Sequence, residues 1–507
     1  MEKLIPKWVF YSGIIILGLY LLVRLLDSAQ MINFFPLARP GDIPMYMGYL
    51  YLLKDVGFHN VVPYWFGGSM VLFQLYPPGF FYATFPIYLL TNSVEFSTYI
   101  MIPILYIIIF ITFMFFAIKE KISKLKMTFF YLILMANPIA IGNFIRLGRV
   151  VELFAWTFMI IIFFLFIYYF NRPLNKYFYL IFIPSYTILL ISHPAIITLF
   201  HLCMLPVSFF FLIGKKDKLF FMLSVALGLL FSAFWWVPFL VTVMNGSSMF
   251  ATPFSLELLR FDTLSYVLSN IASILISLTM FVMFYFYWYY SGKNRRVLYL
   301  FLPILILNFL VLTRLVVFIP VLNNIFCDIY NIFFIFFLML FFVRIPFVKL
   351  KRSFVTIAKY CLFLIPILFV IFSVFYTPFF IIYTPMEYEV ISFLPQVEGS
   401  FFMLKGSSAT SHTPYYYIYG MIYNNLSTPY GSYTYGSVDN NYRYSLSVFQ
   451  EASDNNDCDL LANSLERFDV TSLIAFYEDD CEFLESCGMN LKVDGEYACL
   501  YVKDSMD

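Results

Sequence analysis

The stretch WVFYSGIIILGLYLLVRLL, residues 8–26, is the first of a series of apolar runs, and this series decides the fold. Runs of roughly 16 to 30 residues follow one another as far as residue 383, each long enough or nearly so to cross a bilayer as a helix. Lipid offers the backbone no hydrogen-bond partner, and the alternating pattern of a barrel is absent, so we expect helices. The first run has no small-residue cleavage site and is too long for a signal peptide, so we expect it to be retained.

The composition excludes a soluble globular domain. Of the 507 residues, 62% are hydrophobic and 12% are charged, and the mean hydropathy is +0.83. The net charge of +1 hides an asymmetry: residues 1–383 carry 26 Lys and Arg against 11 Asp and Glu, whereas residues 384–507 carry 5 against 19. A basic membrane part is therefore followed by an acidic part. Basic groups in short loops and an acidic tail predict no nucleic-acid partner.

Short basic loops indicate the orientation of the helices, because such loops stay in the cytoplasm. We expect a cytoplasmic amino terminus and an extracytoplasmic carboxyl-terminal domain, in a plasma membrane because no internal targeting signal is present. The basic loops lie at residues 3–7, 119–126, 172–176, 215–218, 293–296 and 349–352. The path that keeps them all inside has about eleven transmembrane helices, near residues 8–26, 98–118, 127–142, 150–170, 177–192, 195–213, 219–243, 264–290, 297–320, 330–347 and 354–383.

This path divides the chain into two predicted domains. Residues 1–383 form the transmembrane domain, whose first external loop is residues 27–97, and residues 384–507 form an extracytoplasmic acidic domain. The stretch MVLFQLYPPGFFYATFPIYLL, residues 70–90, must then make no net crossing. Its Pro-Pro pair interrupts a helix near the middle, so we predict an interfacial or re-entrant segment. Glycosylation sequons at Asn245 and Asn425 both fall outside.

The residues after 383 predict a small α/β or α+β domain. Residues 458–477 have a helical period followed by a short apolar strand, and LKVDGEYACLYV, residues 491–502, is typical of a hairpin. Residues 407–444, rich in Tyr, Ser and Gly, suggest turns and strands. Four cysteines lie in this domain, so one or two disulfides are expected if they are not buried free thiols: Cys458, Cys481, Cys487 and Cys499.

The first external loop contains the candidate catalytic acid, Asp42. It follows Pro40-Gly41 and precedes Ile43-Pro44, a rigid turn that would hold a carboxylate at the start of the next helix. An ionisable group at the membrane boundary is costly unless it is paired or solvated, so such a group is a functional candidate. The alternative for Asp42 is a structural role as a helix N-cap.

Four motifs, taken in order, resemble the GT-C superfamily of polytopic glycosyltransferases. The chain is most similar to prokaryotic membrane proteins catalogued as "6-pyruvoyl-tetrahydropterin synthase related", although nothing in it suggests pterin chemistry. The resemblance covers roughly residues 8–350. The motifs are GDIPMYMGYLYLLKDVGF (41–58), VVPYWFGGSMVLFQLYPPGFFY (61–82), NFIRLGRVVELFAW (143–156) and SHPAIITLFH (192–201).

The resemblance implies transfer of a sugar from a polyprenyl-phosphate carrier to an acceptor on the outer face, with Asp42 as the general base. Relatives often carry a His a few residues after this acid, where this chain has Met45 and Tyr46. That difference leaves metal coordination and a second proton relay at this place open, and His59 could take the place of the missing His. No cofactor is required, because the phosphate is a stable leaving group, but a divalent cation (Mg or Mn) shared by Asp42 and the phosphate is compatible with this chemistry.

Binding a prenyl phosphate in a low-dielectric groove needs fixed cations. Four arginines match this need, although arginines near helix ends also snorkel to the headgroups: Arg146, Arg149, Arg260 and Arg314. Arg149 and Glu152 could instead simply pair with each other. His193, beside a proline at a helix end, could donate to substrate or be satisfied by backbone.

Aromatic side chains in the first external loop suit the apolar face of a sugar, although an interfacial aromatic belt has the same composition. The candidates are Tyr46, Tyr64, Trp65 and Tyr76. Together these features predict a glycosyltransferase whose partners are the bilayer, a polyprenyl-phosphate sugar and a glycan, lipid or protein acceptor. The alternatives are a transporter or flippase of lipid-linked glycans and a non-catalytic envelope assembly protein. A transporter predicts polar groups spread through the helices and an internal repeat, whereas here the acids gather on one face.

Overall fold

Two compact units make up the chain in the computed structural model. We call the first the helical unit (Met1–Ser28, Met101–Phe234 and Phe250–Phe379) and the second the mixed unit (Ala29–Ile100, Trp235–Met249 and Phe380–Asp507). The structure describes residues 5–37, 41–68, 70–170, 172–203, 215–244, 253–345, 352–404, 413–430, 445–476 and 478–503.

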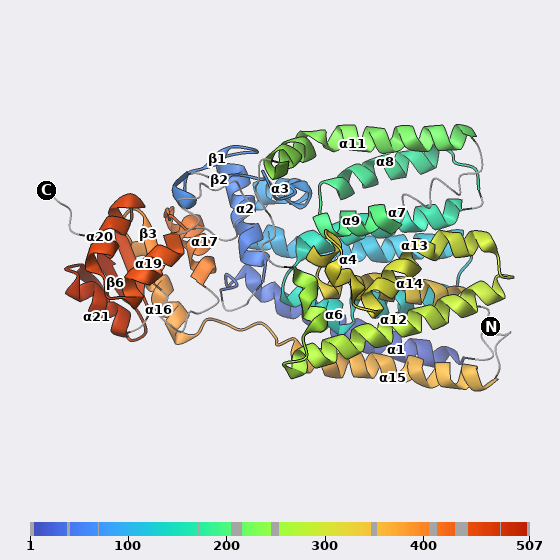
Figure 1. The fold of residues 1–507 in the computed structure, drawn as a ribbon. Coiled ribbons are helices and arrows are strands. Elements are labelled where there is room, and N and C mark those ends of the chain that lie inside the picture. The colour runs from blue at the N-terminus through green and yellow to red at the C-terminus, as the bar shows by residue number, and fades with distance from the viewer. Residues whose placement is uncertain are drawn as a thin grey trace. The chain divides into compact units, whose positions relative to one another are not determined.

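The apolar runs form long helices (Figure 1). Within the described residues, eight helices are long and apolar enough to cross a membrane, and a bent pair, α5 (Lys124–Met135) with α6 (Pro138–Ala140) and η3 (Ile141–Arg146), would make nine. The chain is therefore a multi-pass membrane protein of mostly helical fold. The eight are α1 (Lys7–Ser28), α4 (Val94–Lys119), α7 (Val150–Tyr169), α11 (Lys215–Met244), α12 (Leu264–Tyr290), α13 (Arg295–Leu312), α14 (Cys327–Arg344) and α15 (Arg352–Tyr376).

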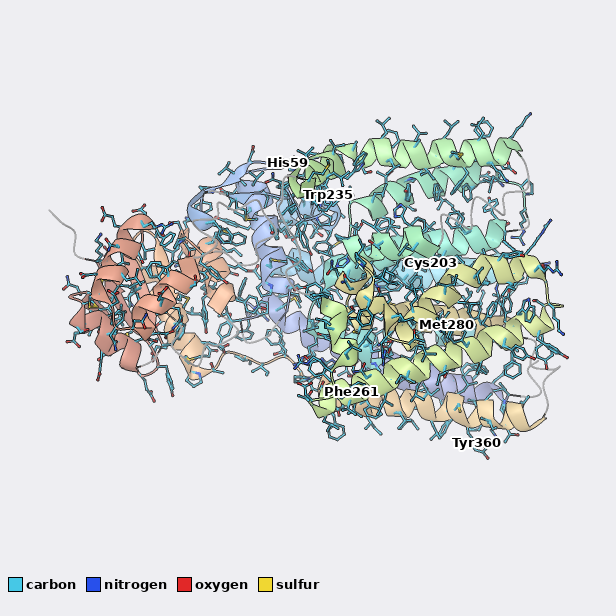
Figure 2. All side chains as sticks on the ribbon, in the orientation of Figure 1. His59, Cys203, Trp235, Phe261, Met280 and Tyr360 are labelled. Carbon is cyan, nitrogen blue, oxygen red and sulfur yellow. A yellow bond between two sulfur atoms is a disulfide. The ribbon has the colours of Figure 1, made fainter. Side chains whose placement is uncertain are left out.

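Burial distinguishes central from peripheral helices in the helical unit. Helices α7 and α14 are almost wholly buried, and their phenylalanines interlock, with Phe163 packed against Phe333 and Phe337. Helix α15 is mostly exposed, and its Tyr360 points away from the neighbouring helices (Figure 2). Exposed apolar side chains on a peripheral helix match a lipid-facing surface, since lipid gives apolar groups no reason to be covered.

The bent pair begins where Asn137 caps a new helix. The Asn137 side-chain oxygen accepts hydrogen bonds from the backbone N–H groups of Ile139 and Ala140, at 2.9 and 3.0 Å. Pro138 at the first helical position cannot continue the preceding helix, because it has no N–H. The two parts therefore meet at 50°.

Two predicted helix ends are wrong. The helix expected to reach residue 320 ends at Leu312, and Arg314 takes a left-handed φ of 64° that no helix continues. The helix expected to reach residue 383 ends at Tyr376, just before Thr377-Pro378, because a residue before proline disfavours the helical conformation.

Two further predicted membrane helices are short where the structure describes them. Helix α8 (Lys176–Leu190) has 15 residues and α9 (Pro194–Cys203) has 10, and the remainder of the predicted helix 195–213 lies outside the described residues. The total of eleven stays a prediction.

The mixed unit contains most of residues 27–97, the predicted first external loop. Helix α2 (Ile43–Asp55) is followed by a two-stranded pairing of β1 (Val61–Val62) with β2 (Met70–Val71), and then by α3 (Gly79–Thr91). Helix α3 begins directly after Pro77-Pro78 and has 13 residues, fewer than the roughly 20 that a crossing needs. Helix α17 (Thr413–Asn424) packs against α2, and Gly48 allows this because a Cβ there would lie 3.1 Å from Ile418.

The rest of the mixed unit is a four-stranded sheet covered by helices. Strand order is β3-β4-β6-β5, with β3 (Phe401–Leu404) parallel to β4 (Ser472–Ala475) and the other pairs antiparallel. The predicted hairpin is confirmed as β5 (Asn490–Asp494) paired with β6 (Cys499–Val502). The surrounding helices are α16 (Pro385–Phe393), α19 (Ser445–Asp454), α20 (Cys458–Arg467) and α21 (Glu478–Ser486).

The four cysteines of this unit form two disulfides, Cys458–Cys487 and Cys481–Cys499. The prediction of turns and strands over residues 407–444 is wrong where the structure describes them, because residues 413–424 form helix α17. Its tyrosines favour strands by propensity, but burial of Tyr415, Tyr416 and Tyr417 in the unit outweighs that preference. Residues 431–444 and the sequon at Asn245 lie outside the described residues.

Candidate active site

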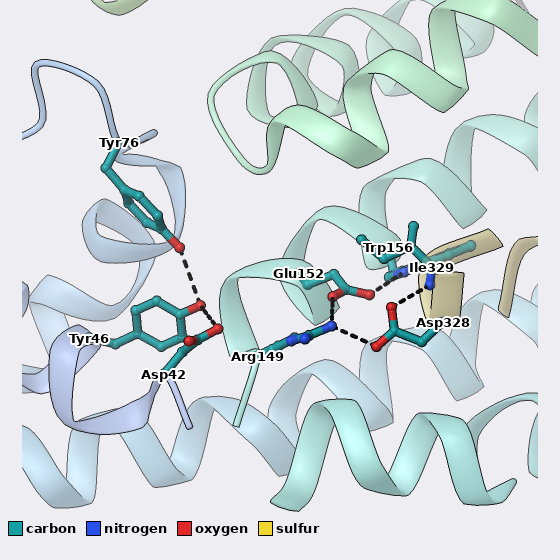
Figure 3. A network of polar contacts seen from close by, with 8 residues as sticks. All are labelled: Asp42, Tyr46, Tyr76, Arg149, Glu152, Trp156, Asp328 and Ile329. Atoms are coloured by element: carbon teal, nitrogen blue, oxygen red, sulfur yellow. Dashed lines mark hydrogen bonds and ion pairs between the residues drawn. The ribbon is translucent and has the colours of Figure 1, made fainter. Parts of the chain in front are cut away.

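Asp42 lies at the start of α2 in the mixed unit. It occupies the N-cap position, but its side chain makes no capping hydrogen bond. Instead, Oδ2 accepts a hydrogen bond from the Tyr46 hydroxyl at 3.1 Å, one helical turn along, and the Tyr76 hydroxyl donates to the Tyr46 hydroxyl at 3.2 Å (Figure 3). The carboxylate is thus oriented by a chain of two tyrosines and does not serve the helix end.

Tyr46 is a fixed hydrogen-bond donor to this carboxylate. It is buried, and burial, followed by the neighbouring Asp42 charge, holds the pKa of its hydroxyl well above the usual range. The hydroxyl therefore keeps its proton at any pH at which the protein would work.

The turn before Asp42 is anchored by the carboxyl-terminal part of the unit. The Gly41 N–H donates to the Tyr415 hydroxyl oxygen at 2.9 Å, and the Tyr415 hydroxyl donates back to the Gly41 carbonyl at 2.8 Å. Tyr415 belongs to α17, more than 370 residues further along the chain. Two reciprocal bonds on one residue fix the direction in which the α2 amino terminus begins.

Most of the predicted aromatic platform is packed inside the mixed unit. Trp65 is fully buried against Tyr49, and Tyr76 stacks on Tyr49 with ring centroids 5.5 Å apart. Of the two, Tyr76 also reaches the Asp42 network through its hydroxyl. The Tyr64 carbonyl accepts a hydrogen bond from the Thr428 N–H at 2.8 Å.

His59 is held by its own neighbours. It stacks on Phe58 at 3.9 Å and hydrogen-bonds to the Phe73 backbone. Burial lowers the pKa of His59, and the bond to Phe73 opposes that effect. None of these contacts joins His59 to Asp42.

A second polar network surrounds Arg149 in the helical unit (Figure 3). Its Nη1 lies 2.7 Å from Asp328 Oδ2 and 3.8 Å from Glu152 Oε2, and the guanidinium lies over the Phe326 ring at 4.5 Å. Glu152 Oε1 also accepts from the Trp156 indole at 3.2 Å. The pairing of Arg149 with Glu152 that the sequence left open is therefore present, but the closer carboxylate is Asp328.

His193 lies in the turn between α8 and α9. Burial, then the nearby positive charge of Arg149, lowers its pKa to about 3, so its imidazole is neutral. Its Nδ1 is buried with no hydrogen-bond partner among the described residues. The structure therefore brings His193 and Glu152, two predicted substrate contacts, close to Arg149.

The other predicted phosphate-binding arginines have different surroundings. Arg146 donates to the Tyr376 carbonyl at 2.9 Å, and Arg314 donates to backbone carbonyls of Val311 and Asn270 at 3.2 and 3.3 Å. Neither has a carboxylate within ion-pair distance in the described part of the chain. Arg260 is exposed and paired with Asp262 at 2.7 Å.

No protein-family model matches the chain, and no curated protein matches it. Solved structures do match over nearly its whole length. The apo oligosaccharyltransferase of Archaeoglobus fulgidus has 10% sequence identity and a TM-score of 0.56, covering 100% of this chain and 76% of that one. The oligosaccharyltransferase AglB of the same organism, in complex with an inhibitory peptide and a dolichol-phosphate, has 9% identity and a TM-score of 0.55, covering 91% and 69%. ArnT from Cupriavidus metallidurans in the apo state has 10% identity and a TM-score of 0.53, covering 96% and 97%.

The fold is GT-C-like, since it matches these solved structures over nearly the whole chain. At about a tenth identity the likeness establishes this fold and leaves the activity to be argued from the residues. In the GT-C fold of this chain, the predicted residues form two groups: Asp42, Tyr46 and Tyr76 in the mixed unit, and Arg149, Glu152 and His193 in the helical unit.

Sequence reasoning missed four polar residues of these surroundings. Asp328 and Glu257 were recognisable as external acids, and burial, then Asp328, raises the pKa of Glu257, so the two carboxylates interact. Arg24 gave no signal of a partner, yet it is fully buried and donates to the Thr377 carbonyl at 2.7 Å. Tyr415 lay in a segment with no local pattern that points to Gly41.

The described residues contain no group of three or more His, Cys, Asp and Glu side chains that could hold a metal ion.

Proposed function

We propose that the protein is a membrane glycosyltransferase that moves a sugar from a polyprenyl-phosphate donor to a glycan, lipid or protein acceptor outside the cytoplasm. The observation that carries the proposal is a carboxylate, Asp42, that occupies a helix start without capping it and is oriented by two tyrosines. The GT-C fold supports it, and the AglB neighbour was solved with a dolichol-phosphate. The proposal also includes a relationship to the "6-pyruvoyl-tetrahydropterin synthase related" membrane proteins, which rests on the four sequence motifs alone.

Asp42 acts as the general base. Its carboxylate accepts the proton of the acceptor hydroxyl while that oxygen forms a bond to the anomeric carbon. The bond from that carbon to the phosphate oxygen breaks, and the polyprenyl phosphate leaves with the electron pair. A carboxylate has about four lone-pair sites, so Asp42 can accept from Tyr46 and from the acceptor at once.

The arginines stabilise the charge of the leaving phosphate. Arg146 and Arg314 suit this role best, because their hydrogen-bond partners are neutral carbonyl and hydroxyl groups and no carboxylate in the described part of the chain compensates their charge. Arg149 and Arg260 must share their charge with Asp328 and Asp262. Tyr64, Trp65, Tyr76, His59 and His193 remain candidate substrate contacts. No cofactor is needed for these steps. A Mg or Mn ion shared by Asp42 and the phosphate would be compatible with them.

We also propose a plasma-membrane location with the amino terminus in the cytoplasm and residues 384–507 as an extracytoplasmic domain. Glu120 supports this orientation, since its two oxygens pair with Arg172 at 3.0 Å and Arg344 at 2.9 Å. The basic loop at residues 119–126, Arg172 and the end of α14 at Arg344 therefore meet at one end of the helical unit, as the positive-inside rule predicts for cytoplasmic positive charges. Two disulfides in the mixed unit favour an oxidising compartment for it.

The test uses purified protein in vesicles with radiolabelled polyprenyl-phosphate sugars and membrane, glycan and protein acceptor fractions. We expect transfer by the parent and at least about a 100-fold loss in Asp42→Asn, because that change removes the base and keeps the shape. Asp55→Asn is the matched control, an exposed acid at the other end of α2, and should keep full activity. Movement of the carrier across the bilayer without transfer, unchanged in Asp42→Asn, would favour the flippase alternative.

A further inference from the structure

A cavity of about 440 Å³ lies at the end of the helical unit that holds Lys7 and the basic loop at residues 119–126. It is formed by the start of α1, the turn between α4 and α5, and the ends of α12 and α14. All of these elements belong to the helical unit. The proposed donor, acceptor and catalytic acid use none of them, so this cavity is separate from the proposed reaction.

The lining is strongly basic. Four cations contribute to it against one acid, Glu120. The two oxygens of Glu120 pair with Arg172 and with Arg344 of the lining, so the cations of the lining outnumber its acid. The four cations are Lys7, Lys121, Lys126 and Arg344.

One polar atom and one helix end in the lining have no hydrogen-bond partner among the described residues, and an anion could supply it. Arg344 Nε is buried and has no hydrogen-bond partner among the described residues, which is unusual for a charged donor. Ser123 is the N-cap of α5 and makes no side-chain capping bond, so the positive end of that 12-residue helix faces the same region.

The remaining lining is apolar. Ile5, Phe10 and Val343 are buried side chains in its wall, and Tyr287 adds an aromatic ring. Cations beside an apolar wall at the end of membrane helices match a phosphate headgroup with the first carbons of its acyl chains. A soluble inorganic anion would leave the apolar side chains of the wall without a partner.

We propose that this cavity binds the phosphate headgroup of an anionic phospholipid from the leaflet that the positive-inside rule assigns to the cytoplasm. The lipid's phosphate oxygens accept from Arg344 and the lysines, and its chains follow the apolar wall. The bound lipid ties the ends of α1, α5, α12 and α14 together.

The test is native mass spectrometry of the full chain released from nanodiscs of phosphatidylcholine with phosphatidylglycerol. We expect one retained phosphatidylglycerol per chain, and roughly 30-fold weaker retention in the double variant Lys121→Gln with Lys126→Gln, because each lost charge weakens headgroup binding severalfold. The matched control is Lys216→Gln with Lys218→Gln, which removes two lysines from another basic loop outside the cavity.

A third variant, Ser123→Trp, fills the cavity and keeps every charge. It should reduce retention as well, whereas attraction by diffuse surface charge would leave it unchanged. Inorganic phosphate that displaces the lipid, and binds alone with the same dependence on Lys121 and Lys126, would keep the anion site and overturn the lipid as its occupant. Equal loss in both lysine pairs, or equal retention of phosphatidylcholine, would overturn the site. Glycosyl transfer enters none of these measurements, so they stand apart from the proposed activity.

Discussion

At the scale of single residues, Tyr46 shows how this fold prepares a carboxylate. The change Tyr46→Phe keeps the ring in its buried place and removes only the hydroxyl that Asp42 accepts from. We expect kcat to fall about tenfold and stability to fall by about 1 kcal/mol, the usual net value of one hydrogen bond. Radiolabel transfer and thermal unfolding in detergent measure the two effects. A variant with full kcat would mean that Asp42 needs no orientation by Tyr46.

Glu257 gives a pH-dependent prediction in the segment η4 (Phe254–Leu259). Burial, then Asp328, raises its pKa above the ordinary 4.5, so the stability that its protonated form provides is present at low pH and is lost as the pH rises through the folded value. At about pH 7 the charged Glu257 therefore costs stability, and Glu257→Gln should raise the unfolding midpoint by about 2 °C. Near pH 4.5 the gain should shrink.

Asp262 is the control, because its pKa is shifted in the opposite direction from that of Glu257. Its hydrogen bond to Arg260 lowers its pKa, so Asp262→Asn should give no stabilisation at neutral pH. Unfolding midpoints measured in one detergent across the pH range check both variants. A gain for Glu257→Gln that is the same at both pH values would mean that charge burial is not its cause.

At the scale of secondary-structure elements, helix α17 positions the start of α2. Tyr415→Phe removes both hydrogen bonds to Gly41, so the turn before Asp42 should shift and kcat should fall about tenfold with KM little changed, because misplaced catalytic groups lose rate more than binding. Tyr417→Phe is the matched control on the same helix, since its hydroxyl accepts from the Met403 N–H of the sheet and makes no described contact with Gly41. Equal kcat losses in the two variants would point to general loosening of α17.

The elements also show what the sequence could reveal. Apolar runs predicted the long helices because lipid imposes one rule on every residue of a span, and Asp494-Gly495 predicted the hairpin because its turn chemistry is local. Helix α17 escaped prediction because its tyrosines are held helical by packing on α2, a contact between distant segments. The buried hydrogen bond of Arg24 could not be predicted for the same reason, since its partner, the Thr377 carbonyl, lies 353 residues away in the sequence.

In the candidate site, too, the features that depend on local sequence could be predicted, and those that depend on contacts between distant segments could not. The sequence Pro-Gly-Asp-Ile-Pro and the family resemblance were enough to single out Asp42. The sequence did not predict that its side chain bonds to Tyr46 and makes no capping hydrogen bond, because the positions of Tyr46 and Tyr76 depend on three-dimensional packing. Arg149 and Glu152 are three residues apart, so their pairing was foreseeable, but Asp328, the closer partner of Arg149, lies 179 residues further along the chain.

At the scale of the whole molecule, the proposed orientation requires the disulfides to lie outside the cytoplasm. In intact cells a membrane-impermeant maleimide should label none of the cysteines in the mixed unit until an impermeant reductant has opened their disulfides, and should then label the partly exposed Cys458, Cys481 and Cys487, whereas Cys499 is buried in β6. Lys216→Cys, at the start of α11, is the control for the other side and should react only after permeabilisation. Peptide mass spectrometry identifies each labelled site. Cysteines of the mixed unit that react only in permeabilised cells would reverse the orientation, and Asp42 would then face a compartment in which the proposed acceptors are absent.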